Sequence, residues 1–444
     1  MMFGTRKGKK IALFAVALFV VFAVGGLVVQ KRCAAEGGND YESIELFTDV
    51  LAIVKKSYVE EVDTKKLIYG AINGMLASLD PHSSFMPPDM YKEMKIDTKG
   101  SFGGLGIEIT IKDGILTVIS PIEDTPAFRA GIKAGDQILK IDDRFTKDMS
   151  IMDAVKRMRG AKGTKVILTI VREGFDKPKD FTLVRDIIQV KSVRSMTLDS
   201  GYGYVRIAQF QEKTDDDLVK ALATLREENG GALKGLVLDL RNDPGGLLDQ
   251  AVKVADHFVE EGLIVYTEGR EKDSRMQFSA RKGGTEPTYP MVVLINGGSA
   301  SASEIVAGAL QDHKRAIVMG TQSFGKGSVQ TIIPLSDDSG LRLTTARYYT
   351  PNGRSIQAKG ITPDIVVERA EIQSAEKKDG HIREKDLENH FESGEKTGEE
   401  DKKTDKEKAP SVKSDEQLKG DYQVQRALDL LKGWEILKTM NKDK

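Results

Sequence analysis

Cysteine is nearly absent from this chain of 444 residues, in which Cys33 stands alone. A single thiol cannot close an intrachain disulfide, so a disulfide scaffold is excluded, as is a zinc site built on several cysteines. A large net charge of either sign is also missing, because 66 Lys and Arg nearly balance 67 Asp and Glu and leave a net charge of −1. That balance argues against a nucleic-acid partner bound through a global basic field. We expect no metal and no cofactor.

One stretch near the N-terminus lacks charge altogether. The run Ile11–Val29 is apolar, follows four basic residues, and is long enough to cross about 30 Å of hydrocarbon. We predict that residues 1–36 form a membrane anchor or an uncleaved signal. Cleavage after Ala34 or Ala35 is the alternative. The positive-inside tendency then places the rest of the chain on the periplasmic side of a bacterial inner membrane.

Apolar residues are scarce near the other end. Residues 371–420 are dominated by Lys, Glu, Asp and Ser, and such a segment cannot bury enough apolar surface to order, so we predict a flexible linker. Residues 421–444 then show the spacing of an amphipathic helix. Its residues available for docking are Val424, Leu428, Leu431 and Trp434.

Two turns rich in small residues carry the chemical signal. The stretch Asn296–Glu304 lies between two apolar runs, which indicates a buried strand turning sharply into a helix. Ser301 would stand at the helix start, where free N–H groups and the helix dipole stabilise a developing oxyanion. A serine in such a turn is, however, most often a cap.

The second turn, Phe324–Gln330, places Lys326 between two glycines and two expected strands. A lysine acts as a general base only when neutral, so its pKa must fall by roughly 2 to 3 units through desolvation. Gln330 offers an uncharged amide that could orient the lysine. Most lysines are instead solvated. A Ser-His-Asp arrangement is the rival, because the chain also contains His82, His257 and His313.

Together, the two turns resemble the catalytic motifs of the carboxyl-terminal processing peptidases, also called tail-specific proteases. The resemblance implies that Ser301 is the nucleophile, Lys326 the base and Gln330 its orienter. Ser299 and Ser303 would then have structural, hydrogen-bonding roles.

A third segment, Leu236–Ala251, resembles the Asp-Leu-Arg-Asn-x-Pro-Gly-Gly motif of the same family. By that analogy the N–H of Gly245 or Gly246 donates one oxyanion-hole hydrogen bond and that of Ala302 the other. The polar residues of the motif could look like metal ligands, but a network that shapes the loop is the favoured role. These residues are Asp239, Arg241, Asn242 and Asp243.

Residues 98–189 resemble a PDZ domain, on the glycine-rich run Phe102–Ile109 and on Ala130–Asp142. Loop N–H groups can capture a terminal carboxylate while the peptide pairs with an open strand edge. The predicted loop is Gly104, Leu105 and Gly106, the groove strand holds Ile107 and Ile109, and Val155 and Met158 form the other wall or belong to the ordinary core.

Strand and helix patterns alternate over residues 190–370, which indicates an α/β fold. The resemblance implies a crotonase-like α/β protease core with an inserted, mostly β, PDZ domain; a doubly wound sheet is the alternative from pattern alone. Residues 37–97 show helical periodicity, with Ile44 and Ile53 on an apolar face. We predict an arm that pairs with a second copy in a homodimer or higher oligomer; packing on the protease core of its own chain is the alternative.

These observations lead to one functional expectation. The chain is expected to be a membrane-anchored serine endopeptidase that recognises apolar carboxyl-terminal tails of exported proteins and cleaves them through an acyl-enzyme. An activating adaptor is a further expected partner. The alternatives are a non-catalytic PDZ scaffold or adaptor at the membrane and, less favoured, a crotonase-like acyl-transfer enzyme.

Overall fold

The computed structural model describes residues 40–122, 124–147, 149–271, 273–283, 286–370 and 420–440. The predicted membrane segment, residues 11–29, and nearly all of the predicted linker lie outside these ranges. Among the described helices, none is long and apolar enough to cross a membrane. The chain divides into two compact units, residues 1–85 and residues 86–444.

The first unit is helical where it is described. Residues 40–57 form one helix and α2 (Thr64–Ala77) a second. The α2 helix begins where Asp63 accepts a hydrogen bond from the Lys65 N–H at 2.8 Å, as an N-cap does. Ile44 and Ile53, on the predicted apolar face of the first helix, are 60% and 61% exposed.

The second unit begins with α3 (Pro88–Lys99), which leads into the predicted PDZ domain. This domain has its own hydrophobic core, built on a six-stranded antiparallel sheet that contains β3, β4, β5, β6, β7 and β8, while β2 pairs with β9. Its elements are β2 (Ser101–Gly104), β3 (Ile107–Lys112), β4 (Ile115–Pro121), α4 (Pro126–Arg129), β5 (Gln137–Ile141), β6 (Arg144–Phe145), α5 (Ile151–Met158), β7 (Lys165–Val171), β8 (Lys179–Val184) and β9 (Asp186–Gln189).

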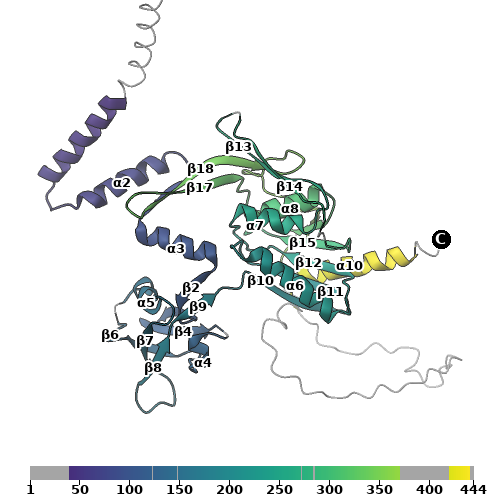
Figure 1. Cartoon of the computed structure of the whole chain (residues 1–444), viewed down its shortest axis with the longest axis horizontal. Coiled ribbons are helices and arrows are strands. Elements are labelled where there is room, and N and C mark those ends of the chain that lie inside the picture. The colour runs from purple at the N-terminus through teal and green to yellow at the C-terminus, as the bar shows by residue number, and fades with distance from the viewer. Residues whose placement is uncertain are drawn as a thin grey trace, which may run out of the picture. The chain divides into compact units, whose positions relative to one another are not determined.

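The remaining elements form a mixed α/β core (Figure 1). Its main sheet has the order β10-β11-β12-β15-β16-β19, in which only the β10–β11 pair is antiparallel. In a second, antiparallel sheet, β18 pairs with β17 and β13, and β13 pairs with β14. The elements are β10 (Val193–Asp199), β11 (Tyr202–Ile207), α6 (Thr214–Glu228), β12 (Gly235–Asp239), α7 (Leu248–Asp256), β13 (Gly262–Gly269), β14 (Met276–Ala280), β15 (Met291–Ile295), α8 (Ala302–Asp312), β16 (Ile317–Gly320), β17 (Ser328–Pro334), β18 (Gly340–Tyr349), β19 (Ile365–Val366) and α10 (Tyr422–Met440).

The two faces of the main sheet are buried by different helices. Along β12, Leu236 and Leu238 join the core formed with α6, α7 and α8, whereas Val237 joins a separate core formed with α10. This alternation is the period of two that a strand imposes. Because the three crossover helices share one face, the doubly wound alternative, with successive helices on both faces, is wrong.

Candidate active site

Three loops meet at one edge of the main sheet. The parallel strands β12, β15 and β16 are neighbours, so the loops that follow their carboxyl ends lie side by side, as ligand sites in open α/β sheets do. The three predicted catalytic segments occupy these loops: the Pro-Gly-Gly turn after β12, the serine turn after β15 and the lysine turn after β16. The order of the strands in the main sheet therefore brings the three motifs together.

The serine turn holds Ser301 in an uncommon backbone conformation. Its φ is 59° and its ψ −113°, immediately before α8 begins, and a positive φ is rare for a residue with a Cβ. Ser299 Oγ donates to the Leu240 carbonyl at 2.7 Å, and Ser303 Oγ donates to the Asp243 carbonyl at 2.9 Å. The hydrogen-bonding roles predicted for these two serines are confirmed, and both serines join the turn to the loop after β12.

A residue that the sequence interpretation missed links the serine and lysine turns. The carboxylate of Glu304, fully buried in the first turn of α8, accepts the N–H groups of Ser301 at 2.8 Å and Lys326 at 2.9 Å. It also accepts the Gly325 N–H at 2.7 Å and the Ser323 hydroxyl at 2.6 Å. The Ser-x-x-Glu spacing typical of a capping box was the available signal.

The Pro-Gly-Gly turn lies directly against the serine turn. A Cβ added at Gly245 would come within 2.7 Å of Ser301 Cβ and 2.9 Å of the Ala302 nitrogen, so only glycine fits there. The Gly245 N–H donates to Asp243 Oδ1 at 2.8 Å. Gly246 has a φ of 146° and packs against the Phe210 carbonyl, which again excludes a side chain.

Asp243 is a fully buried carboxyl group within this turn. Burial raises its pKa to about 7, although the hydrogen bond from the Gly245 N–H acts in the opposite direction. Its Oδ2 atom meets no hydrogen-bond donor among the described residues. The main-chain carbonyl of the same residue accepts the Ala300 N–H at 2.9 Å. Asp243 thus fastens the Pro-Gly-Gly turn to the serine turn.

Lys326 is half-buried at the start of the second sheet. The phenol of Tyr348, on β18, donates to the Lys326 carbonyl. Burial raises the pKa of Tyr348. Gln330, four residues further along β17, donates its amide to Ser328 Oγ at 2.9 Å and to Thr344 Oγ1 at 3.2 Å. These bonds fix the position of the Gln330 side chain on the strand.

The histidines do not support the rival triad. His313 follows the last turn of α8, about 18 Å along the helix from Ser301, where its Nε2 contacts the Leu263 carbonyl at 2.7 Å. His257 stands at the far end of α7 and pairs with Asp215 at 2.6 Å. The backbone N–H of His82 donates to Asp80 within a turn of the first unit. His313 and His257 therefore lie at the opposite ends of α8 and α7 from the three loops.

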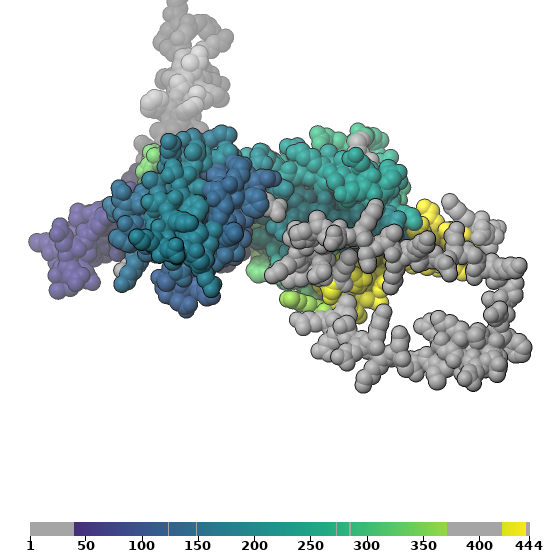
Figure 2. Space-filling model, turned by 90° about the horizontal axis from the view of Figure 1, so that it is seen from below, coloured from purple at the N-terminus to yellow at the C-terminus, as the bar shows by residue number. Residues whose placement is uncertain are grey.

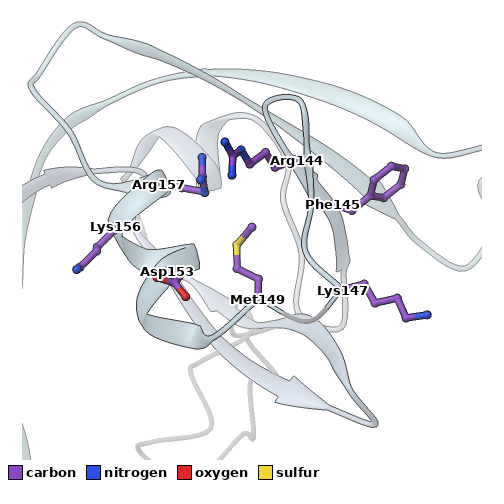
Figure 3. A pocket seen from close by; sticks show the side chains of 7 residues that line it. All are labelled: Arg144, Phe145, Lys147, Met149, Asp153, Lys156 and Arg157. Carbon is purple, nitrogen blue, oxygen red and sulfur yellow. The ribbon is translucent and has the colours of Figure 1, made fainter. Parts of the chain in front are cut away.

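The predicted peptide-binding residues occupy two different environments in the PDZ region. Leu105 and Met158 are buried in its core, whereas Ile107 and Ile109 are half-buried along β3. Val155 is half-buried on α5, Gly104 is buried at the end of β2, and Gly106 is buried directly before β3. Separately, a cavity of about 530 Å³ opens beside α5; Met149 points into it, and Phe145 and Lys147 point away (Figure 3). None of the predicted peptide-binding residues lines that cavity.

Three parts of the chain match the models of known families. Residues 201–367 match Peptidase family S41, residues 103–183 match the PDZ domain, and residues 27–90 match the activating protease CtpB N-terminal domain. Among solved structures, the photosystem II D1 C-terminal processing protease is 32% identical, over 73% of this chain and 92% of that one, with a TM-score of 0.42.

Two curated relatives are similar over most of their length. The carboxy-terminal-processing protease of Bartonella bacilliformis is 48% identical, covering 93% of this chain and 94% of the relative. The carboxy-terminal processing protease CtpA of Bacillus subtilis is 36% identical, covering 80% of this chain and 75% of the relative. This chain belongs to the carboxy-terminal-processing proteases of peptidase family S41.

Proposed function

We propose that the chain is a serine endopeptidase in which Ser301 is the nucleophile and Lys326 the general base. Neutral Lys326 takes the hydroxyl proton while Ser301 Oγ attacks the scissile carbonyl, and the resulting ammonium then protonates the leaving amine. Water, deprotonated by the same lysine, hydrolyses the acyl-enzyme and releases Ser301. Gln330 orients the lysine with an uncharged amide, which does not raise the lysine pKa as a carboxylate would.

The observation that carries this proposal is the set of hydrogen bonds at Glu304. One buried carboxylate binds the N–H groups of Ser301 and Lys326, so the two turns are held at a fixed separation. The positive φ of Ser301 supports the same role, since backbone strain of this kind collects at functional sites. A helix cap accounts for the bond between Glu304 and the Ser301 N–H, but it needs neither the bond to the Lys326 N–H nor the positive φ of Ser301.

The oxyanion would be stabilised by two backbone N–H groups. Ala302 opens α8, where the first N–H groups have no partner within the helix. Of the two candidate glycines, Gly245 already donates its N–H to Asp243, so Gly246 is the better second donor. Gly245 would instead allow the turn to lie close against Ser301, since a Cβ there would meet Ser301 Cβ at 2.7 Å.

We further propose that the PDZ domain selects substrates by their free, apolar carboxyl-terminal tails. The loop at Gly104 and Gly106 would receive the terminal carboxylate, and the half-buried Ile107 and Ile109 along β3 would border the peptide. Residues 11–29 would anchor the chain in the inner membrane, with the catalytic region on the periplasmic side and exported proteins as its substrates.

The direct test is hydrolysis of an unfolded protein with an apolar tail, using a chain that lacks residues 1–36. Ser301→Ala and Lys326→Ala should each abolish cleavage, while the exposed controls Ser336→Ala and Lys253→Ala should retain it. Full activity in all variants would refute the dyad. A wild-type chain that binds the tail but never cleaves it would favour the scaffold alternative.

The lysine base also fixes the direction of the pH dependence. Activity should fall as the pH is lowered, because protonated Lys326 cannot accept the serine proton. The measurement is kcat/KM across the pH range in which the folded chain is stable. Full activity well below neutrality would count against Lys326 as the base.

A further inference from the structure

The helix α10 is far from the active-site motifs in sequence but closes the second face of the sheet that carries them. Its residues Val424, Ala427, Leu428 and Leu431 are buried against Tyr204, Val237, Val292 and Leu294 of the main sheet. In Figure 1 the helix, in yellow, lies along β12, and Figure 2 shows its atoms seated against the teal and green atoms of the core. This face has no other helix covering it among the described elements.

The N-terminal end of α10 makes a polar contact that packing alone does not require. Asp421 accepts from Arg241 Nη1 at 3.0 Å and lies 2.9 Å from Nη2, and Gln423 Oε1 accepts from Nη1 at 2.8 Å. Arg241 is only 7% exposed, and its guanidinium also binds both oxygens of Asp239, at 2.9 and 2.7 Å. The arginine is therefore held from two directions, by its own strand and by α10.

Arg241 belongs to the loop that forms one wall of the candidate active site. The next residue, Asn242, has a φ of 57° and exchanges hydrogen bonds with Asn296 of the serine turn, at 2.9 and 3.0 Å. Asp243 follows and binds Ala300, and Gly245 then lies against Ser301. Only three residues separate the arginine held by α10 from the glycine that touches the nucleophile.

We propose that Asp421 and Gln423 are positioning residues for the reaction, which act through Arg241 to hold the Pro-Gly-Gly turn against Ser301. The proposal rests on the proposed function, because it assigns the turn a part in stabilising the oxyanion. Docking of α10 then completes the active site as well as the core. A displacement of about 1 Å at such a site can cost about a hundredfold in rate, so a remote contact of this kind has a measurable effect.

The contact can be removed without disturbing the rest of the helix. Asp421 also accepts the Val424 N–H at 3.2 Å as the helix begins, so an alanine would remove a cap as well. Asp421→Ser keeps a capping oxygen but is too short and uncharged to hold the guanidinium. The matched control is Lys432→Gln, which breaks the ion pair with Asp199 further along the same helix.

Both variants should be measured in the full chain for kcat, KM and stability. We expect Asp421→Ser to lower kcat by about tenfold with little change in KM, because the tail-binding surface is untouched. Lys432→Gln should stay within about twofold of wild type, since exposed ion pairs contribute little. Asp421→Glu keeps a carboxylate at this position, so its kcat should fall less than that of Asp421→Ser.

A second readout does not depend on cleavage. Hydrogen exchange at the amides of Asp243, Gly245, Gly246 and Leu247 should accelerate in Asp421→Ser and remain unchanged in Lys432→Gln. Equal behaviour of the two variants, either both unaffected or both losing rate in proportion to stability, would overturn the proposal. If Ser301→Ala still cleaves, the proposed function fails, but the exchange experiment still decides whether α10 positions the turn.

Discussion

The two faces of the main sheet are covered in contrasting ways. One face packs against α6, α7 and α8, each of which connects strands of the core and lies close to them in sequence. The other packs against α10, which follows a segment of about fifty residues beyond β19. The loops of the candidate active site therefore depend on both the local crossover helices and a distant helix. The helix α8 begins directly after Ser301 and carries Glu304, and the residues at the start of α10 hold Arg241.

The largest effect should come from the locally covered face. Glu304→Gln puts an amide donor among four N–H and O–H donors, so at least one buried group loses its acceptor. We expect kcat to fall by about a hundredfold and the free energy of unfolding by ~3 kcal/mol. Kinetics and urea denaturation measure both.

The matched control is Asp249→Asn in the first turn of α7. This side chain is 61% exposed, so its replacement should change neither the rate nor the stability appreciably. Wild-type behaviour of Glu304→Gln would show that the two turns are held together by other contacts.

The next prediction concerns the buried carboxyl group of Asp243. Its folded pKa of about 7 lies above the value of 3.8 in the unfolded chain, so the native state retains a proton that the unfolded state has lost between those pH values. The stability of wild type relative to Asp243→Asn should therefore fall as the pH rises from about 4 to about 7, by at most ~4 kcal/mol. Urea denaturation of both proteins across this range gives the difference; a constant difference would refute the raised pKa.

The last prediction compares the loss of stability caused by replacing two residues of α10, one of which should have the smallest effect of all. Leu431 is 2% exposed, and its replacement by alanine should lower the free energy of unfolding by ~3 kcal/mol. Trp434, which the sequence pattern also assigned to docking, is 53% exposed, and Trp434→Ala should cost less than about 1 kcal/mol. Thermal denaturation distinguishes them. Equal losses would mean that α10 docks through a different face.

Much of the site could be predicted because its signals are local. The apolar run before Ser301 and the glycines around Lys326 predict turns at strand ends, and the order of the strands then brings the turns together. Glu304 was missed because a carboxylate at the third position of a helix is usually explained as a solvated cap. The Asp421–Arg241 contact spans 180 residues, and no periodicity predicts which loop a distant helix end will meet.

In the PDZ region, the sequence predicts less about where individual side chains lie. The glycine-rich run predicts a backbone feature, but the burial of Leu105 and Met158 depends on how the strands and α5 pack into one core, which alternation alone does not give. The prediction that Trp434 docks was wrong for a related reason. The helical spacing defines an apolar stripe, but it does not fix where the sheet beneath that stripe ends.

We propose that Ser301 attacks the substrate with Lys326 as its base, and trapping of the acyl-enzyme tests this most directly. The protein is mixed with an activated ester of an apolar tail peptide, the reaction is quenched rapidly, and the mass of the intact protein is measured. An ester acylates faster than the intermediate is hydrolysed, so the acyl-enzyme should accumulate. We predict a mass increase equal to the acyl group, located on Ser301, absent in Ser301→Ala and strongly slowed in Lys326→Ala. Turnover without an adduct on Ser301, or the same adduct in Ser301→Ala, would contradict it.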